Sequence, residues 1–288
     1  MNCLFPHVGN SHFSFSSQHY NQRFFSTTQI HYNSRTNFIE DQENKSTMGL
    51  IKSAIGDAIL TFTWVFTTPL LGVLISVVSS YLAVEPKTLP SLFITINLAT
   101  LRLYMFTFIA ALLGGASFNP TAALSLYTAG LKPDASLMSM AVRFPAEAAG
   151  AVAGAVAILK SMPVKYKHMV KGLSLNVELQ TGAMIGVIFS FLYCFSLIFV
   201  LTKGPKNLLV KLWLLACARV SIGIVVNSVK QTGIIMNPAS AYGWAYLSNW
   251  HNNWDFFCVY WICPFIGAVL AAWFFRFMFR GSIKAKQA

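Results

Sequence analysis

Two short stretches of this chain each contain an Asn-Pro step, preceded by a glycine-containing approach and followed by small and apolar residues. They cover residues 115–124 and 232–241, and their asparagines, Asn119 and Asn237, lie 118 positions apart (237 minus 119). Asparagine is a preferred N-cap and proline is tolerated at the first helical position, so each step predicts the start of a short helix. The repetition predicts two related halves.

Composition places the chain in a membrane. Of its 288 residues, 55% are hydrophobic and 10% are charged, against about 25% charged in an average protein. The net charge of +12 comes from Lys and Arg residues that lie mostly between and after the apolar runs, which indicates lipid headgroups rather than nucleic acid as the partner. A helix crosses the hydrocarbon with about 20 apolar residues. This length predicts six spans, at 54–82, 90–113, 138–159, 178–201, 208–229 and 254–279.

The two halves, 48–160 and 172–280, share further landmarks. Asp57 lies 62 residues before the first asparagine (119 minus 57), and Glu178 lies 59 before the second (237 minus 178). Three spans per half is an odd number, so the second half enters the bilayer upside down, as in an inverted repeat. The two Asn-Pro stretches are too short to span and are expected to dip in from opposite sides. Because irregular backbone at membrane depth must be buried or line a wet cavity, their meeting point predicts a lumen.

Two helix N-termini at the centre of a lumen determine what can pass. Each carries roughly half a positive charge from its dipole, which raises the energy of a cation there, including hydronium. The amides of Asn119 and Asn237 can donate to a passing oxygen while their carbonyls cap the helices. A water molecule held by two donors cannot relay a proton through them. The pattern therefore predicts passive passage of water or another small neutral solute, with ions and protons excluded.

These features resemble the aquaporin (major intrinsic protein) family over nearly all of residues 49–280. The boxes read Asn119-Pro120-Thr121 and Asn237-Pro238-Ala239, where the family usually has Asn-Pro-Ala twice. The altered first box, the basic charge, the motif Ser53-Ala-Ile-Gly-Asp57 and the lysine-rich tail resemble the first subgroup of plant small basic intrinsic proteins. The resemblance implies an all-α membrane fold of six helices plus two re-entrant half-helices, and a homotetramer. It also implies that Asp57 and Glu178 accept hydrogen bonds from the backbone of the re-entrant loops.

The positions that form the selectivity filter in this family depart from the usual pattern. After the second box, most aquaporins have an Arg that narrows the outer mouth, and this chain has Ser240. The other filter positions implied by the resemblance are Ile234, Val225 and Ala99, with Val225 in place of the His of water-selective members. The constriction is therefore expected to be wider or more apolar than usual, and an apolar ring can slow water by dewetting.

Four charged residues inside the predicted spans need partners, because buried charge is costly. Arg143 and Glu147 are four residues apart on one helix and are expected to pair with each other. Arg102 and Arg219 have two open interpretations. Either can face the lumen and replace the missing filter Arg, or each can have a partner in a neighbouring helix or lie nearer the interface.

Small residues spaced four apart occur in the third and sixth spans. The pairs are Gly150 with Gly154, and Gly267 with Ala271. Such pairs allow two helices to cross closely. Since the repeat makes them equivalent, the third and sixth helices are expected to touch there, near the pseudo-two-fold axis.

Both ends of the chain differ from the predicted channel domain, 48–280. Residues 1–47 have transit-peptide composition; the alternative is a disordered or spurious extension ahead of a start at Met48. The side that would hold both termini collects more Lys and Arg, which predicts cytosolic termini. On that side, Lys284 and Lys286 in the basic tail 281–288 match a Lys-x-Lys-x-x retrieval signal for the endoplasmic reticulum membrane.

Two other functional classes remain as alternatives. An ion-coupled secondary transporter shares inverted repeats and broken helices, but it is expected to use a carboxylate or His at the midplane, and none lies beside either box. A non-conducting structural membrane protein is compatible with the altered filter. An enzyme is not expected, because all six His residues lie outside the predicted spans and no Ser-His or Cys-His arrangement is apparent. No cofactor or metal site is predicted.

Overall fold

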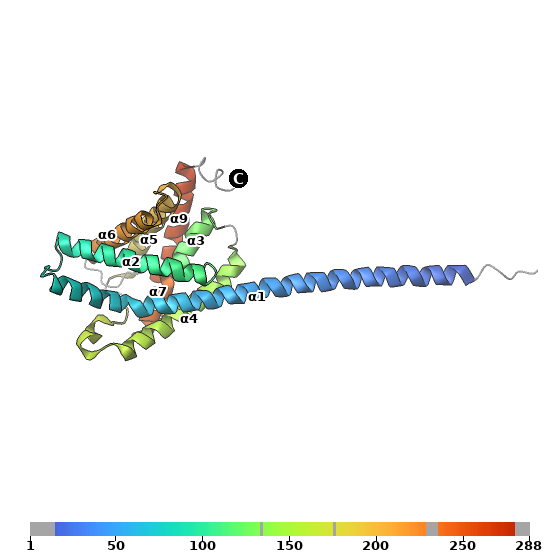
Figure 1. Ribbon diagram of the computed structural model, residues 1–288, viewed down its shortest axis with the longest axis horizontal. Coiled ribbons are helices and arrows are strands. Elements are labelled where there is room, and N and C mark those ends of the chain that lie inside the picture. The colour runs from blue at the N-terminus through green and yellow to red at the C-terminus, as the bar shows by residue number, and fades with distance from the viewer. Residues whose placement is uncertain (1–14, 133–134, 175–176, 229–235, 280–288) are drawn as a thin grey trace, which may run out of the picture. The chain divides into compact units, whose positions relative to one another are not determined.

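The structure is a computed structural model that describes residues 15–132, 135–174, 177–228 and 236–279, with residues 15–46 described by their backbone alone. Every element in the described part of the chain is a helix. Six of these helical stretches are long and apolar enough to cross a membrane, as predicted. They are Thr47–Tyr81 within α1 (Phe15–Tyr81), α2 (Leu89–Leu112), α4 (Leu137–Ser161), α5 (Leu179–Lys203), Leu208–Val226 within α6 (Leu208–Ser228), and Trp254–Met278 (Figure 1).

The last of these spans is built from three consecutive pieces. These are α8 (Trp254–Phe257), the π-helical turn η2 (Cys258–Ile262) and α9 (Cys263–Met278). Pro264 lies at the start of α9, and a proline both lacks an N–H and crowds the carbonyl of the preceding turn. The π-turn in front of it widens the helix at the point where the regular ladder is interrupted.

The chain divides into two compact units, Met1–Leu50 and Ile51–Ala288. Helix α1 begins at Phe15, inside the segment 1–47 for which the sequence suggested a disordered or spurious extension. The described backbone there is helical, and both the transit peptide and the extension stay predictions. The segment from 11 to 48 contains neither Gly nor Pro, the two residues that most strongly interrupt a helix.

Two short helices lie within the second unit and link its two halves. They are α3 (Pro120–Thr128) and α7 (Pro238–Leu247). The short helix α3 packs against α9 at the end of the chain, and α7 packs against α4 of the first half. Figure 1 shows α3 alongside α9. Each half therefore places its short helix against the last span of the other half, which is the reciprocity expected of an inverted repeat.

Small residues allow the close helix crossings, but their partners differ from the expectation. A Cβ on Gly154 of α4 would lie 2.5 Å from the carbonyl oxygen of Phe62 on α1, and one on Gly150 would overlap Ala58 of the same helix. In the sixth span, a Cβ on Gly267 would overlap the backbone of Val187 on α5. The small pairs thus join spans within one half.

The third and sixth spans do touch, but through aromatic side chains. The rings of Phe144 on α4 and Phe265 on α9 lie 5.6 Å apart between centroids. The fully buried Ala271 groups instead with Cys194 of α5. The predicted contact between the third and sixth helices is thus present, but it does not run through the small-residue pairs, because each of these accommodates a backbone from its own half.

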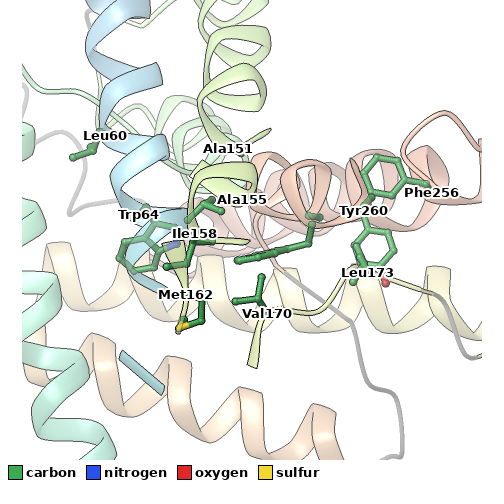
Figure 2. Packing of buried hydrophobic residues seen from close by; sticks show 14 of the residues in the cluster. Leu60, Trp64, Ala151, Ala155, Ile158, Met162, Val170, Leu173, Phe256 and Tyr260 are labelled. Carbon is green, nitrogen blue, oxygen red and sulfur yellow. The ribbon is translucent and has the colours of Figure 1, made fainter. Parts of the chain in front are cut away.

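The largest hydrophobic cluster unites α1, α4, α7 and the span that begins at Trp254. Figure 2 shows part of it, with Trp64 of α1 beside Ile158 of α4. The connector after α4 contains the short helix η1 (Val164–Met169) and adds Val170 and Leu173 to this core. Leu173 is further held by α7, because its backbone N–H donates to the carbonyl of Trp244 at 3.1 Å. The core therefore holds the second short helix in place.

Candidate functional site

The first Asn-Pro box begins helix α3 through its asparagine. Asn119 is buried and has an extended backbone, with φ −143° and ψ 103°. Its side-chain carbonyl accepts a 3.1 Å hydrogen bond from the backbone N–H of Thr121. Pro120 follows at the first helical position, where the missing N–H costs nothing. The local sequence thus explains why the helix starts at this point.

The second box repeats this arrangement at the start of α7. Asn237 is buried and extended, with φ −128° and ψ 102°, and its carbonyl accepts from the N–H of Ser240 at 3.3 Å. Pro238 again takes the first helical position, and Ala239 beside it is fully buried. The two boxes therefore share cap chemistry although the cap bond reaches one residue further in the second.

A direct hydrogen bond joins the two boxes. The side-chain nitrogen of Asn237 donates to the backbone carbonyl of Phe118 at 2.7 Å, and Phe118 immediately precedes Asn119. The starts of α3 and α7 therefore meet at one place, as the inverted repeat predicts. One of the two amide hydrogens of Asn237 is used by the protein itself. Only the other remains for a passing solute.

Asp57 of α1 connects the approach to the first box with α4. It is fully buried and accepts a 2.7 Å hydrogen bond from the backbone N–H of Ser117. Arg143 donates to both of its carboxylate oxygens, from Nε at 2.5 Å and from Nη2 at 2.8 Å. This bidentate contact is the strongest common geometry between an arginine and a carboxylate.

This ion pair replaces the predicted one between Arg143 and Glu147. Glu147 is fully buried, and neither of its carboxylate oxygens has a hydrogen-bond partner of good geometry among the described residues. The i, i+4 rule considers one helix alone, whereas the glycine crossing of α1 and α4 brings Asp57 within reach. The prediction was therefore wrong about the partner.

Glu178 lies at the N-cap of α5, at the residue where the fourth span was predicted to begin, and its side chain makes no cap hydrogen bond. The approach to the second box, including Ile234, lies outside the described residues, as do Lys284 and Lys286. Bracing of the second loop by Glu178 thus stays a prediction.

The remaining filter candidates are dispersed over three helices. Ser240 is buried in the first turn of α7, and its hydroxyl has no hydrogen-bond partner in the described part of the chain. Val225 of α6 is 51% exposed, and Ala99 lies partly buried on α2. No described contact brings these three side chains together, so their role in a common constriction stays a prediction.

Two arginines and one tryptophan form a cluster that the sequence did not predict. The guanidinium carbons of Arg102 on α2 and Arg219 on α6 lie 3.7 Å and 4.8 Å from the centroid of the Trp64 ring. Arg102 also donates to the Trp64 carbonyl and, at 2.8 Å, to the hydroxyl of Thr68. For Arg102 the structure thus provides the partner in a neighbouring helix that was one of its two interpretations.

The cluster lies next to the first box. The Trp64 ring is stacked on Phe118, with centroids 4.1 Å apart and planes inclined by 20°. Phe106 of α2 meets both rings edge-on. Both arginines were visible in the sequence as charges within spans. Their shared tryptophan was not, because the three residues come from three helices far apart in the chain.

The sequence of this chain matches a known protein family. The model of the family described as Major intrinsic protein matches residues 44–275. The chain belongs to the major intrinsic protein family. The chain is 46% identical to Aquaporin SIP1-1 of Oryza sativa subsp. japonica over 231 residues, covering 80% of this chain and 93% of that protein. It is 44% identical to Aquaporin SIP1-1 of Arabidopsis thaliana over 232 residues, covering 81% and 94%.

These relatives confirm the predicted resemblance to the small basic intrinsic proteins among the major intrinsic proteins. A solved structure, the aquaglyceroporin from Plasmodium falciparum, matches with a TM-score of 0.59 over 82% of this chain and 99% of its own. At 18% identity this match concerns the fold alone. It confirms the predicted fold class of six spans with two half-helices. As a major intrinsic protein, the chain is a passive membrane channel for water and small solutes.

Proposed function

We propose that water, together with other small neutral solutes, passes the two Asn-Pro boxes in single file while ions and protons are excluded. The observation that carries this proposal is the hydrogen bond from Asn237 to the Phe118 carbonyl. It supports a point at which two helix N-termini converge, and each N-terminus contributes roughly half a positive charge. A cation at this point is repelled from both sides. A neutral molecule with an acceptor oxygen is not.

Selection in this proposal depends on the amide hydrogens that the protein leaves available. The carbonyl of each asparagine is held by the cap bond, at Thr121 N–H for Asn119 and at Ser240 N–H for Asn237. Both side chains are thereby oriented with the nitrogen away from the cap. A water that accepts from such donors is oriented by them, which interrupts a proton relay. The filter positions Ala99, Val225, Ile234 and Ser240 add little polarity, so we expect slower water passage than in a channel with a filter Arg.

Reconstitution of the purified chain into proteoliposomes tests this function. Stopped-flow light scattering after an osmotic step should give a water permeability above that of empty vesicles, and a pH-sensitive dye inside the vesicles should report no accompanying proton entry. Permeability equal to that of empty vesicles would favour the non-conducting structural alternative. Solute uptake that requires a sodium or proton gradient would favour the secondary transporter.

We also propose that four copies assemble and that the protein resides in the endoplasmic reticulum membrane with cytosolic termini. The support is the resemblance to the family and the match of Lys284 and Lys286 to a Lys-x-Lys-x-x retrieval signal. Replacing both lysines with Ser should release a tagged chain from the reticulum. An unchanged distribution argues against the retrieval signal, and a monomer mass in mild detergent argues against the tetramer.

A further inference from the structure

Arg102 and Arg219 lie beside the same tryptophan, and the described residues provide no carboxylate that balances their charges. Both guanidinium groups are within 4.8 Å of the Trp64 ring centroid. Among the described residues, no acidic side chain forms an ion pair with either arginine; Asp57 is occupied by Arg143. A charge removed from water needs a counter-charge or strong hydrogen bonds. Stacking on one shared indole compensates only part of this cost, because two cations compete for the same ring.

The hydrogen-bond donors of the two arginines are also incompletely used. Arg102 uses Nη2 for the Trp64 carbonyl and the Thr68 hydroxyl, while its Nε is buried without a partner in the described part of the chain. Arg219 makes no hydrogen bond to a described residue, although an arginine has five N–H donors. Buried donors are normally satisfied, so the buried Arg102 Nε, which has no partner among the described residues, is a donor that a bound anion could use.

The surroundings add further positive potential. Trp64 stacks on Phe118, whose carbonyl accepts from Asn237. The cluster is therefore adjacent to the N-termini of both half-helices, and each of these favours a nearby anion.

We propose that Trp64, Arg102 and Arg219 form a binding site for a small monovalent inorganic anion of the halide and nitrate class. Two guanidinium groups beside one indole supply positive charge, and the buried Nε of Arg102 supplies an N–H donor without a partner among the described residues. This is the chemistry that arginine uses for anions. Two single positive charges shared over one indole suit a singly charged anion better than a divalent sulfate or phosphate. Most family members have an Arg at the position of Ser240. In this chain the two arginines beside the boxes provide part of that missing positive charge.

Thermal unfolding of the full chain in detergent tests this site without any measurement of transport. The midpoint is followed at constant ionic strength and pH while potassium gluconate is replaced stepwise by chloride, bromide or nitrate. A ligand that binds only the folded state raises the midpoint in a saturable manner. Arg219→Gln should weaken the apparent affinity for chloride at least tenfold. It is the informative variant because Arg219 holds no described hydrogen bond whose loss would unfold the protein.

A matched arginine provides the control. Arg276 lies outside the cluster and donates to the Thr128 carbonyl at 3.1 Å, so Arg276→Gln should leave the anion dependence unchanged. Equal midpoints in chloride and gluconate would overturn the proposal. So would a dependence that rises linearly without saturation, or one that is the same in Arg219→Gln as in the parent chain.

Bromide provides a second measurement that locates the site. Bromide quenches indole emission on contact, so saturable quenching is expected in the parent chain and should disappear in Trp64→Phe. Trp273 is exposed on α9, and Trp273→Phe should retain the saturable part. Saturable quenching that survives Trp64→Phe would place the anion elsewhere and refute this assignment.

Discussion

The side-chain nitrogen of Asn237 lies 2.7 Å from the backbone oxygen of Phe118 and donates a hydrogen bond to it. This bond spans 119 positions of sequence and connects the two half-helices at their starts. The same amide group caps α7 through its oxygen. One asparagine therefore both begins a helix and attaches it to the other half, so a change at this residue should affect transport and stability together.

Asn237→Asp separates these two roles. Aspartate caps a helix about as well as asparagine, but it has no N–H for Phe118 and places a negative oxygen against that carbonyl. We expect the free energy of unfolding to fall by about 1–3 kcal/mol, the cost of a buried unpaired acceptor. Water permeability should fall and cation leakage should rise, measured by stopped-flow scattering and a potassium-sensitive dye. Asn253→Asp is the control, because Asn253 caps α8 by the same kind of bond; equal effects of both changes would contradict the prediction.

Asp57→Asn should destabilise the channel strongly. It leaves Arg143 without its carboxylate partner in a site where the Asp57 side chain is fully buried, and breaking such a pair costs about 3–5 kcal/mol. Thermal unfolding in detergent measures the loss. The double variant Asp57→Asn with Arg143→Met should recover part of the stability, since no uncompensated charge remains. The stability loss of the double variant is compared with the losses of Asp57→Asn alone and Arg143→Met alone. If the two single losses add up to the loss of the double variant, the ion pair is not the cause.

Gly243→Ala tests the contact between α7 and α4. A Cβ at Gly243 would lie 2.6 Å from the carbonyl oxygen of Ala151, so the helices must separate, at a cost of about 1–3 kcal/mol for overpacking. Gly223→Ala on α6 is the matched control, because no atom lies within 4 Å of a Cβ there. That change should stabilise the helix by up to about 1 kcal/mol. Unfolding midpoints that move in the same direction for both variants would argue against close packing at Gly243.

Ser240→Arg should not restore an ordinary filter. Ser240 is buried in the first turn of α7, where the helix N-terminus already carries a partial positive charge. An added guanidinium without a carboxylate should lower the unfolding midpoint and the water permeability. Ser240→Ala should be neutral or slightly stabilising, since the hydroxyl is buried without a partner in the described residues. Higher water permeability in the Arg variant would contradict this expectation.

The features that sequence predicted well depend on local chemistry. The second span was predicted at 90–113 and is found at Leu89–Leu112, because the length of an apolar run sets the length of a membrane helix. Both half-helices begin at the proline of their box, since the cap and first-turn preferences are contained in consecutive residues.

The features that sequence missed depend on which helices cross. Arg143 pairs with Asp57 across 86 positions rather than with its neighbour on the same helix. Trp64 collects an arginine from α2 and another from α6, and no spacing rule connects these segments. Glu178 lies at the N-cap of its helix, whereas Asp57 lies well inside α1, and the offset to the asparagine alone does not distinguish these two places.

The reciprocal packing of α4 on α7 and of α3 on α9 has a consequence for how the protein is made. When the ribosome has delivered the first half to the membrane, the face of α4 that carries Ala151 has not yet met α7, since Trp244 and Ala245 are still to be synthesised. The packing of the first half is thus completed only after the second half has been made.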